Sequence, residues 1–422
     1  MPRRGLFTYE NALVLILGLT FGIVFFDRQA PSSLMIFVKP DLHLDNTQVG
    51  QLGAALSLTW AISALGVGLI SDRTGKRKPV LIACVIGFSI CSAISGMAHS
   101  FGVLLASRFF MGLLEGGVMP ICLAIMAVES SDSRRGLNAG IVQNGFSNLV
   151  GNAAGPIVLI AIATAMNWRD AFYIAGIPGL FCALAIWLWV KEPAKHIPAP
   201  EEAPARRVSI IDSLIAMIMV RNIAICSLVS IFMVSWLICG FSFLPLVFVE
   251  LRHYSPKTAG DLMGALGICA FLGGALVPGL SDRIGRKPVL VVGCFTAMVA
   301  PLAAVYFQGP IVILGALLFV GWVGNGLFPM FMGAIPGESL PRASIATAMG
   351  IVVGVGEFVG GVCGPWLAGW LADTTSFKLE APMLMMAGCA FVAGCLAFFL
   401  KETAPAKVGM AAAAHAALSK AA

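Results

Sequence analysis

Four ionisable residues stand inside stretches that are otherwise apolar. Asp27 and Arg28 occur in FGIVFFDRQAPSS, and Arg108 and Glu115 occur in RFFMGLLEGGVMP. Residues seven apart in a helix lie two turns apart, so Arg108 and Glu115 share one helix face. The planar forks of arginine bind carboxylates through paired hydrogen bonds, and carboxylates accept and release protons. The set therefore predicts a site that binds an anionic solute and transfers a proton.

A purely structural role explains this set less well. A charge at the centre of a membrane helix costs roughly 2.5–3.5 kcal/mol on insertion scales, so such charges are rarely incidental. A structural ion pair needs one acid and one base, whereas two of each occur here. Because the proton occupancy of a buried carboxylate depends on the charges beside it, such a site can couple a proton to a solute. For Asp27 and Arg28, a structural ion pair or a snorkelling end residue stays the alternative.

The chain around these residues has the composition of a membrane protein. Of its 422 residues, 59% are hydrophobic and 11% are charged, whereas soluble domains carry about 25% charged residues. Apolar runs of roughly 20 residues, the length that spans a bilayer, recur along the sequence. Twelve spans are predicted, starting near residues 10, 47, 79, 101, 136, 168, 222, 258, 288, 309, 343 and 379. The first run lacks a small-residue cleavage site, so we expect a span there and not a removable signal peptide.

Positive charge and a polar linker predict the topology. Most of the 27 Lys and Arg residues lie in the termini and the even-numbered connections, so the positive-inside rule places both termini in the cytoplasm of a plasma (inner) membrane protein. The connector KEPAKHIPAPEEAPARRVS is polar and proline-rich, which marks a boundary. We predict an N-terminal bundle over residues 1–190, a cytoplasmic linker over 191–221, a C-terminal bundle over 222–402 and a cytoplasmic tail over 403–422.

The two halves repeat one another. SDRTGKRKPVL from Ser71 returns as SDRIGRKPVL from Ser281, and GLLEGGVMP from Gly112 returns as GWVGNGLFP from Gly321. AGP ending at Pro156 matches CGP ending at Pro365, at a spacing of 209 residues, the same as between Gly112 and Gly321. Three anchors at nearly one spacing predict two six-helix halves of the same order, which enclose a site near the middle of the membrane.

The doubled loop, GLISDRTGKRKP and GLSDRIGRKP, resembles the signature loop of the major facilitator superfamily. Twelve spans and a central linker fit that family over nearly the whole chain. The resemblance implies an all-α membrane protein of two pseudo-symmetric six-helix bundles. In this family such loops help to latch the outward-facing state, whereas the simpler reading is a positive-inside anchor. The gating residues that the resemblance implies are Asp72, Arg73, Asp282, Arg283 and Arg286.

A narrower resemblance comes from FFDRQAPSS in span one and RFFMGLLEGGVMP in span four. Together these motifs resemble the anion:cation symporter branch, which takes up sugar acids and other organic anions. By that resemblance Arg28 and Arg108 face the anion, while Asp27 and Glu115 carry protons. Spinster-like lipid carriers are similar at the same places, so export of an amphipathic lipid or drug is the alternative function.

Span five carries a stripe of amides. In QNGFSNLVGNAAGP, Asn144, Asn148 and Asn152 recur every fourth residue beside Gln143. Such amides either join helices or line a cavity for polar solutes, and the two readings weigh equally. At the spacing of 209, Asn148 corresponds to Glu357 in GVGEFVGG of span eleven. We predict that Glu357 faces inward as a second proton carrier or an acceptor for substrate.

The second half supplies aromatic and amide candidates but not a second ionic set. Trp236 corresponds to Asp27, and Gly324 corresponds to Glu115. Trp236 and Asn325 are candidates for shaping the substrate pocket, with packing as the alternative for each.

Enzymatic and signalling functions find no support in the sequence. HExxH, P-loop and GxSxG motifs are missing, and the five histidines lie in loops or tails. The eleven cysteines stand singly in apolar segments, as small packing residues do. We therefore expect a transporter with no catalytic residue, no cofactor, no metal and no nucleic-acid partner. Its partners are a small organic anion, protons and the lipid bilayer, and nothing in the sequence demands more than a monomer.

Overall fold

The computed structural model describes residues 8–131, 134–192, 219–340, 344–405 and 407. Within these ranges all regular secondary structure is helical. The first half contains α1 (Tyr9–Asp41), α2 (Asn46–Thr74), α3 (Arg77–Gly96), α4 (Phe101–Glu115), α5 (Val118–Glu129), α6 (Arg135–Gly140), η1 (Ile141–Gly145), η2 (Ser147–Ala154), α7 (Gly155–Ala165) and α8 (Trp168–Trp189).

The second half contains α10 (Arg221–Leu246), η3 (Val247–Leu251), α11 (Pro256–Ile284), α12 (Arg286–Ala297), α13 (Val299–Tyr306), α14 (Ile311–Trp322), η4 (Val323–Leu327), η5 (Met330–Ala334), α15 (Ile335–Ser339), α16 (Ile345–Val355), η7 (Gly356–Gly360), α17 (Gly361–Thr374) and α18 (Glu380–Ala397). Several of these elements continue one another, so that one membrane span consists of two or more of them.

The number of spans agrees with the sequence prediction. Eleven helical segments in the described ranges are long and apolar enough to cross a membrane. The 29-residue helix α2 is a further long helix between the first and second of these. The segments begin close to the predicted starts, as at Tyr9, Trp168 and Arg221. The predicted all-α, twelve-helix membrane fold is confirmed.

Helix ends follow local sequence signals. Asp45 caps α2 in a reciprocal capping box with Gln48, and Ser100 caps α4 through its side chain. The turns after the two signature helices need glycine, because Gly75 has φ 65° and Gly285 has φ 122°. These two turns set where α3 and α12 begin.

Interruptions of the regular helix recur in both halves. The fourth span breaks between α4 and α5 at Gly116 and Gly117, and the corresponding part of the tenth span is the 3-10 segment η4. The fifth span contains the π-helical segment η2, and η7 occurs 209 residues later in the eleventh span. Because π-helical turns occur often at functional sites, these spans are where a site is expected.

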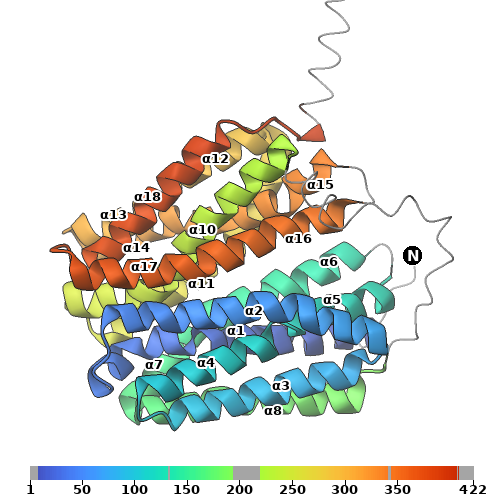
Figure 1. The fold of residues 1–422 in the computed structure, drawn as a ribbon, viewed down its shortest axis with the longest axis horizontal. Helices are drawn as coiled ribbons and strands as arrows, with labels where there is room; N and C mark the ends of the chain where they lie inside the picture. The colour runs from blue at the N-terminus through green and yellow to red at the C-terminus, as the bar shows by residue number, and fades with distance from the viewer. Residues whose placement is uncertain (1–7, 132–133, 193–218, 341–343, 406, 408–422) are drawn as a thin grey trace, which may run out of the picture. The chain divides into compact units, whose positions relative to one another are not determined.

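The chain divides into two compact units, which are described separately. The first unit comprises residues 1–199, 241–271 and 365–379, and the second comprises 200–240, 272–364 and 380–422. In the first unit α3 packs along α8 and α4, while α1 packs along η2, α7 and α8 (Figure 1). In the second unit α12 and α13 pack against α18.

The predicted domain boundaries stay predictions. Residues 193–218 of the predicted linker lie outside the described residues, as do residues 406 and 408–422 of the predicted tail.

Candidate functional site

The four ionisable residues singled out by the sequence converge within the first unit. Asp27 and Arg28 come from α1, and Arg108 and Glu115 come from α4. Asp27 interacts electrostatically with Arg108. Glu115 interacts electrostatically with the other three residues. The site is therefore one ionic cluster, which we call the α1–α4 cluster.

Both carboxylates of the α1–α4 cluster are fully buried. Asp27 and Glu115 are each 0% exposed. The Ser92 hydroxyl donates a hydrogen bond of 2.6 Å to Oδ1 of Asp27, while Oδ2 has no hydrogen-bond partner among the residues that the structure describes. Neither carboxylate oxygen of Glu115 has a hydrogen-bond partner in the described structure. A buried ionised carboxylate without partners is very costly, so these groups are suited to holding a proton.

Arg108 is buried within the same cluster. Its side chain is 1% exposed, its Nη2 group donates to Ser95 Oγ, and its Cζ lies 5.6 Å from the centre of the Phe172 ring. Nε and Nη1 have no hydrogen-bond partner among the described residues. In this conformation Arg108 does not reach a solvent-filled space, so its contact with a solute stays a prediction.

Arg28 has a different environment. It is half-buried, and its Cζ lies 5.6 Å from the ring centre of Phe25 and 5.2 Å from that of Trp60. Its guanidinium makes no hydrogen bond or ion pair with any residue in the described ranges. The ring faces hold the cation while the N–H donors stay available, as cation–π contacts use the face of the guanidinium. Arg28 is thus arranged to bind an anion.

Close helix approaches position both rings. A Cβ atom added at Gly151 of η2 would lie 2.9 Å from the carbonyl carbon of Phe25. A Cβ at Gly112 of α4 would lie 3.1 Å from the backbone nitrogen of Trp60. Only glycine permits these distances, so the sequence brings η2 against α1 and α4 against α2.

Trp60 is a candidate that the sequence analysis missed. Its side chain is 7% exposed, and its indole N–H has no acceptor among the described residues. A buried indole N–H normally finds a partner. The guanidinium of Arg28 lies beside its ring, 5.2 Å from the ring centre.

The predicted amide stripe joins helices and continues into α1. Gln29 donates to Asn152 Oδ1 at 2.9 Å, and Asn152 donates to Asn148 Oδ1 at 2.9 Å. Asn148 in turn donates to the carbonyl oxygen of Asn144 at 2.9 Å. The helix-joining reading describes Asn152, which is buried, while the cavity-lining reading of Asn144, which is exposed, stays a prediction. Gln29 was missed because it lies outside the stripe.

Gln143 lies beside this chain of amides. Its Nε2 group is 3.5 Å from the sulfur of Met119, a weak acceptor. Its side chain is half-buried, so both nitrogen and oxygen can reorient toward a polar solute.

The predicted site residues of the second unit differ in exposure. Trp236 is fully buried, donates to the carbonyl oxygen of Ala297 at 3.1 Å and stacks on Trp322 with ring centres 4.8 Å apart. Asn325 in η4 and Glu357 in η7 are half-buried. In this conformation the geometry of Trp236 is that of a packing residue.

Among the predicted gating residues, Arg286 is the centre of an ion network. It pairs with Asp282 at 2.6 Å and with Glu338 at 2.7 Å. Arg283 is exposed, and the side chains of Asp72 and Arg73 lie outside the described part of the structure. Glu338 was missed because it lies in a different span, and no pattern in the sequence links the two.

Glu402 extends this network. Its carboxylate accepts hydrogen bonds from the backbone N–H groups of Arg286, at 2.8 Å, and Lys287, at 3.2 Å. It therefore caps the start of α12, where a negative charge is stabilised by the helix dipole.

Helix ends within the first unit are also joined by polar contacts. Asp373 of α17 accepts four hydrogen bonds from the start of α2: backbone N–H groups of Asn46 (3.1 Å) and Thr47 (2.6 Å), and their side chains at 2.8 and 2.7 Å. Lys39 pairs with Glu250 at 2.8 Å. These contacts join segments of the first half of the sequence to segments of the second half within one unit, and the sequence analysis did not identify them.

No metal centre is found in the described ranges, where no group of three or more His, Cys, Asp or Glu side chains lies close enough to hold an ion.

Comparison with known proteins decides the family. The sequence profile described as Major Facilitator Superfamily matches residues 17–357. The chain belongs to the major facilitator superfamily. It is thus a membrane transporter and not an enzyme.

Two curated relatives of this transporter have names that describe their solutes. The chain is 30% identical to a probable 4-methylmuconolactone transporter of Cupriavidus pinatubonensis, over 79% of this chain and 78% of the relative. It is 27% identical to the 3-(3-hydroxy-phenyl)propionate transporter of Escherichia coli, over 92% and 96%. Among solved structures, an inward-facing, unoccupied bacterial homologue of the human lysosomal transporter Spinster matches with a TM-score of 0.75. That match covers 94% of this chain and 97% of the other at 18% identity, and it supports the fold alone.

Proposed function

We propose that this transporter takes up a small organic anion together with protons, by alternating access. The observation that carries the proposal is Arg28, whose guanidinium is held by two ring faces with its donors available. The buried carboxylate of Glu115 lies within electrostatic range of Arg28, and that of Asp27 lies within range of Arg108 and Glu115. Binding site and proton carriers are therefore parts of one arrangement.

Arg28 and Trp60 supply the donors for the anion. A guanidinium binds a carboxylate through two parallel hydrogen bonds, and the indole N–H of Trp60 adds a third. The rings of Phe25 and Trp60 favour a substrate with an apolar or aromatic body. Gln143, Asn144 and Asn148 supply polar groups for hydroxyls. The names of the relatives, one of which denotes an aromatic carboxylate, are in line with such a substrate.

Asp27 and Glu115 supply the proton sites, and the charge balance explains the coupling. The α1–α4 cluster holds two arginines and two carboxylates, so it is neutral when both acids are ionised and carries one positive charge when one acid is protonated. A monoanion therefore binds best to the protonated cluster, and it dissociates more readily once the proton has left. This reciprocal effect is what symport requires. Arg108, buried beside both acids, keeps the second charge in place.

Movement between the two states needs contacts that break at each end. Arg286 with Asp282 and Glu338 forms such a contact within the second unit, and Asp373 with the start of α2 forms one within the first unit. By the positive-inside rule the Arg286 network faces the cytoplasm, with both termini, in the inner membrane. Arg283, and Asp72 and Arg73 in the first half, belong to the same proposed gate.

Uptake into proteoliposomes tests the proposal. One proton per monoanion moves no net charge, so an outside-acid gradient of one pH unit drives about tenfold accumulation. The probes are labelled 3-(3-hydroxyphenyl)propionate and a panel of sugar acids, each measured with and without a protonophore. A membrane potential added at constant pH raises accumulation if two protons accompany each monoanion, and it leaves accumulation unchanged if one does.

The spinster-like alternative predicts a different outcome. Absence of uptake of every acid, together with export of a lysophospholipid by the same protein, would replace the symport proposal.

A further inference from the structure

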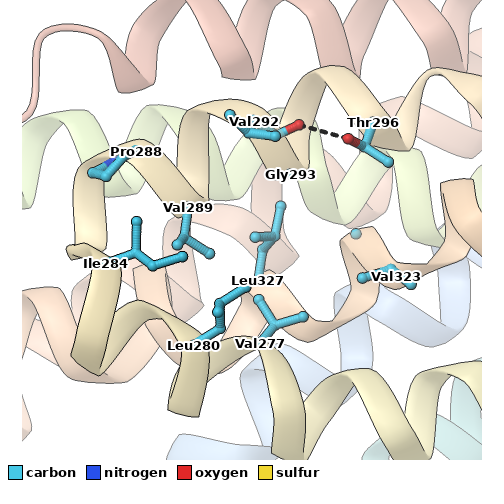
Figure 2. A pocket seen from close by; sticks show the side chains of 11 residues that line it. Val277, Leu280, Ile284, Pro288, Val289, Val292, Gly293, Thr296, Val323 and Leu327 are labelled. Atoms are coloured by element: carbon cyan, nitrogen blue, oxygen red, sulfur yellow. Dashed lines mark hydrogen bonds between the residues drawn. The ribbon is translucent and has the colours of Figure 1, made fainter.

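A groove on the second unit lies away from the α1–α4 cluster in the sequence. It has a volume of about 270 Å³ and lies among α11, α12 and η4. Figure 2 shows Val277, Leu280, Ile284, Val289 and Leu327 among the side chains that line it. The one hydroxyl in the lining, on Thr296, donates to the carbonyl oxygen of Val292 at 2.9 Å and is thus satisfied. The groove offers no free polar group and is suited to a hydrocarbon.

Two glycines let α12 and η4 pack closely beside the groove. A Cβ atom added at Gly293 would lie 2.6 Å from Cδ2 of Leu327, and one at Gly324 would lie 2.7 Å from Cβ of Ala297. Leu280 and Val292 are 49% and 65% exposed although both belong to apolar, membrane-length helices. The groove therefore opens toward the acyl layer of the membrane.

Two cations without protein partners mark one end of the groove. Arg283 immediately precedes the lining residue Ile284, and Lys287 immediately precedes the lining residue Pro288. Neither side chain makes a hydrogen bond or ion pair with another described residue. This end is the start of α12, where the chain turns at Gly285.

The neighbouring carboxylates do not neutralise these two cations. Asp282 and Glu338 both pair with Arg286. Glu402 accepts backbone N–H groups at the start of α12. The positive charges of Arg283 and Lys287 thus remain available to a ligand.

We propose that the groove binds one acyl chain of an anionic phospholipid, with the lipid phosphate between Arg283 and Lys287. An apolar channel that ends at unpaired cations matches a lipid with a charged headgroup, and such basic pockets between membrane helices bind anionic lipids. The lipid comes from the leaflet that the α11–α12 turn faces.

Native mass spectrometry of the purified, detergent-solubilised transporter tests this proposal. The protein is titrated with phosphatidylglycerol and, separately, with phosphatidylcholine of the same acyl chains. Each cation near the headgroup contributes ~1 kcal/mol, which corresponds to about fivefold in affinity. We expect the first phosphatidylglycerol to bind at least fivefold more tightly than the first phosphatidylcholine.

Two kinds of variant separate the headgroup from the chain. Arg283→Gln with Lys287→Gln should reduce the preference to less than twofold, while Lys401→Gln, the loss of a positive charge outside the groove lining, should leave it unchanged. Val289→Phe fills the groove and should weaken both lipids by a similar factor. Equal binding of the two lipids by the unaltered protein, or a preference that survives the double variant, overturns the proposal. So does a dimer that disappears in Val289→Phe, because the groove would then hold a second copy of the chain.

Discussion

The two halves of the chain have corresponding backbones and different chemistry. At a spacing of 209 residues, the break between α4 and α5 corresponds to η4, and η2 corresponds to η7. At the same spacing the acids of the α1–α4 cluster correspond to Trp236 and Gly324. In the first half two buried carboxylates lack full hydrogen bonding, whereas Trp236 is stacked on Trp322 and bonded to Ala297.

The backbone features that the halves share indicate what the fold requires, and the side chains that differ indicate what the function requires. The irregular segments occur in both halves because helices of this fold must bend and approach closely at these places, and the glycines there permit it. Two fully buried carboxylates without full pairing, Asp27 and Glu115, occur among the described residues of the first half, and such groups are costly and persist where they have a use.

Removal of either acid should have the largest effect. We expect Asp27→Asn and Glu115→Gln each to reduce accumulation at a gradient of one pH unit from about tenfold to none, because the neutral side chain cannot carry the proton. Exchange of labelled for unlabelled substrate should survive in at least one of them. Glu357→Gln is the matched change in the second half. If this variant retains accumulation, proton coupling is confined to the first half.

Normal concentrative uptake in both first-half variants contradicts the coupling role. If Glu357→Gln alone abolishes accumulation, the two halves have opposite roles to those proposed.

Replacement of Arg28 tests the anion site. Arg28→Lys keeps the charge but loses the planar fork and its contacts with Phe25 and Trp60. We expect KM to rise about 10- to 100-fold, because one or two charge-assisted hydrogen bonds to the substrate are lost. Arg108→Lys is the matched control, and its effect should fall mainly on the pH dependence of uptake. An unchanged KM for Arg28→Lys in correctly inserted protein contradicts the assignment.

Two buried tryptophans, one in each half, test the comparison between the halves. Trp60→Phe should raise KM about 2- to 10-fold with little change in the melting temperature, because its N–H has no acceptor in the protein. Trp236→Phe leaves the carbonyl oxygen of Ala297 without its donor, so it should lower the melting temperature and leave KM unchanged. Transport kinetics and thermal unfolding in detergent provide both measurements. The reverse pattern contradicts the division between binding and packing.

The smallest expected effect concerns Glu402. Partial burial raises the pKa of its carboxyl, but hydrogen bonds from four backbone N–H groups outweigh that and hold the pKa below its usual value. Its stabilising effect is therefore present above the unfolded pKa of about 4.3 and is lost as the pH falls through the lower folded pKa. We expect Glu402→Gln to lower the melting temperature by about 1–2 °C at pH 6 and by less near pH 3.5.

Glu380→Gln, which removes a carboxylate without a hydrogen bond to any other described residue, is the control for that measurement. A difference between wild type and Glu402→Gln that grows as the pH falls contradicts the assignment.

The sequence predicted the fold and the ionic cluster for a common reason. Charges such as Asp27 and Glu115 are conspicuous in apolar spans, and the spans themselves follow from length and hydropathy. Trp60 was not predictable, because an indole in a membrane helix is ordinary until its missing acceptor is seen. Asp373, Glu338 and Glu402 lie near helix ends where polar residues are common, and their partners are 50 to 330 residues away. Such contacts depend on which helix ends meet, and local patterns do not carry that information.

The four hydrogen bonds on Asp373 have a consequence for leakage. The Asp373 carboxylate accepts hydrogen bonds from two successive residues, Asn46 and Thr47. Losing the hydrogen bonds of one residue alone would leave the carboxylate charge poorly solvated. We therefore expect this contact to open in one cooperative step. A partly open entrance would then be a short-lived species. If uptake is coupled to protons as we propose, few protons would cross without a solute.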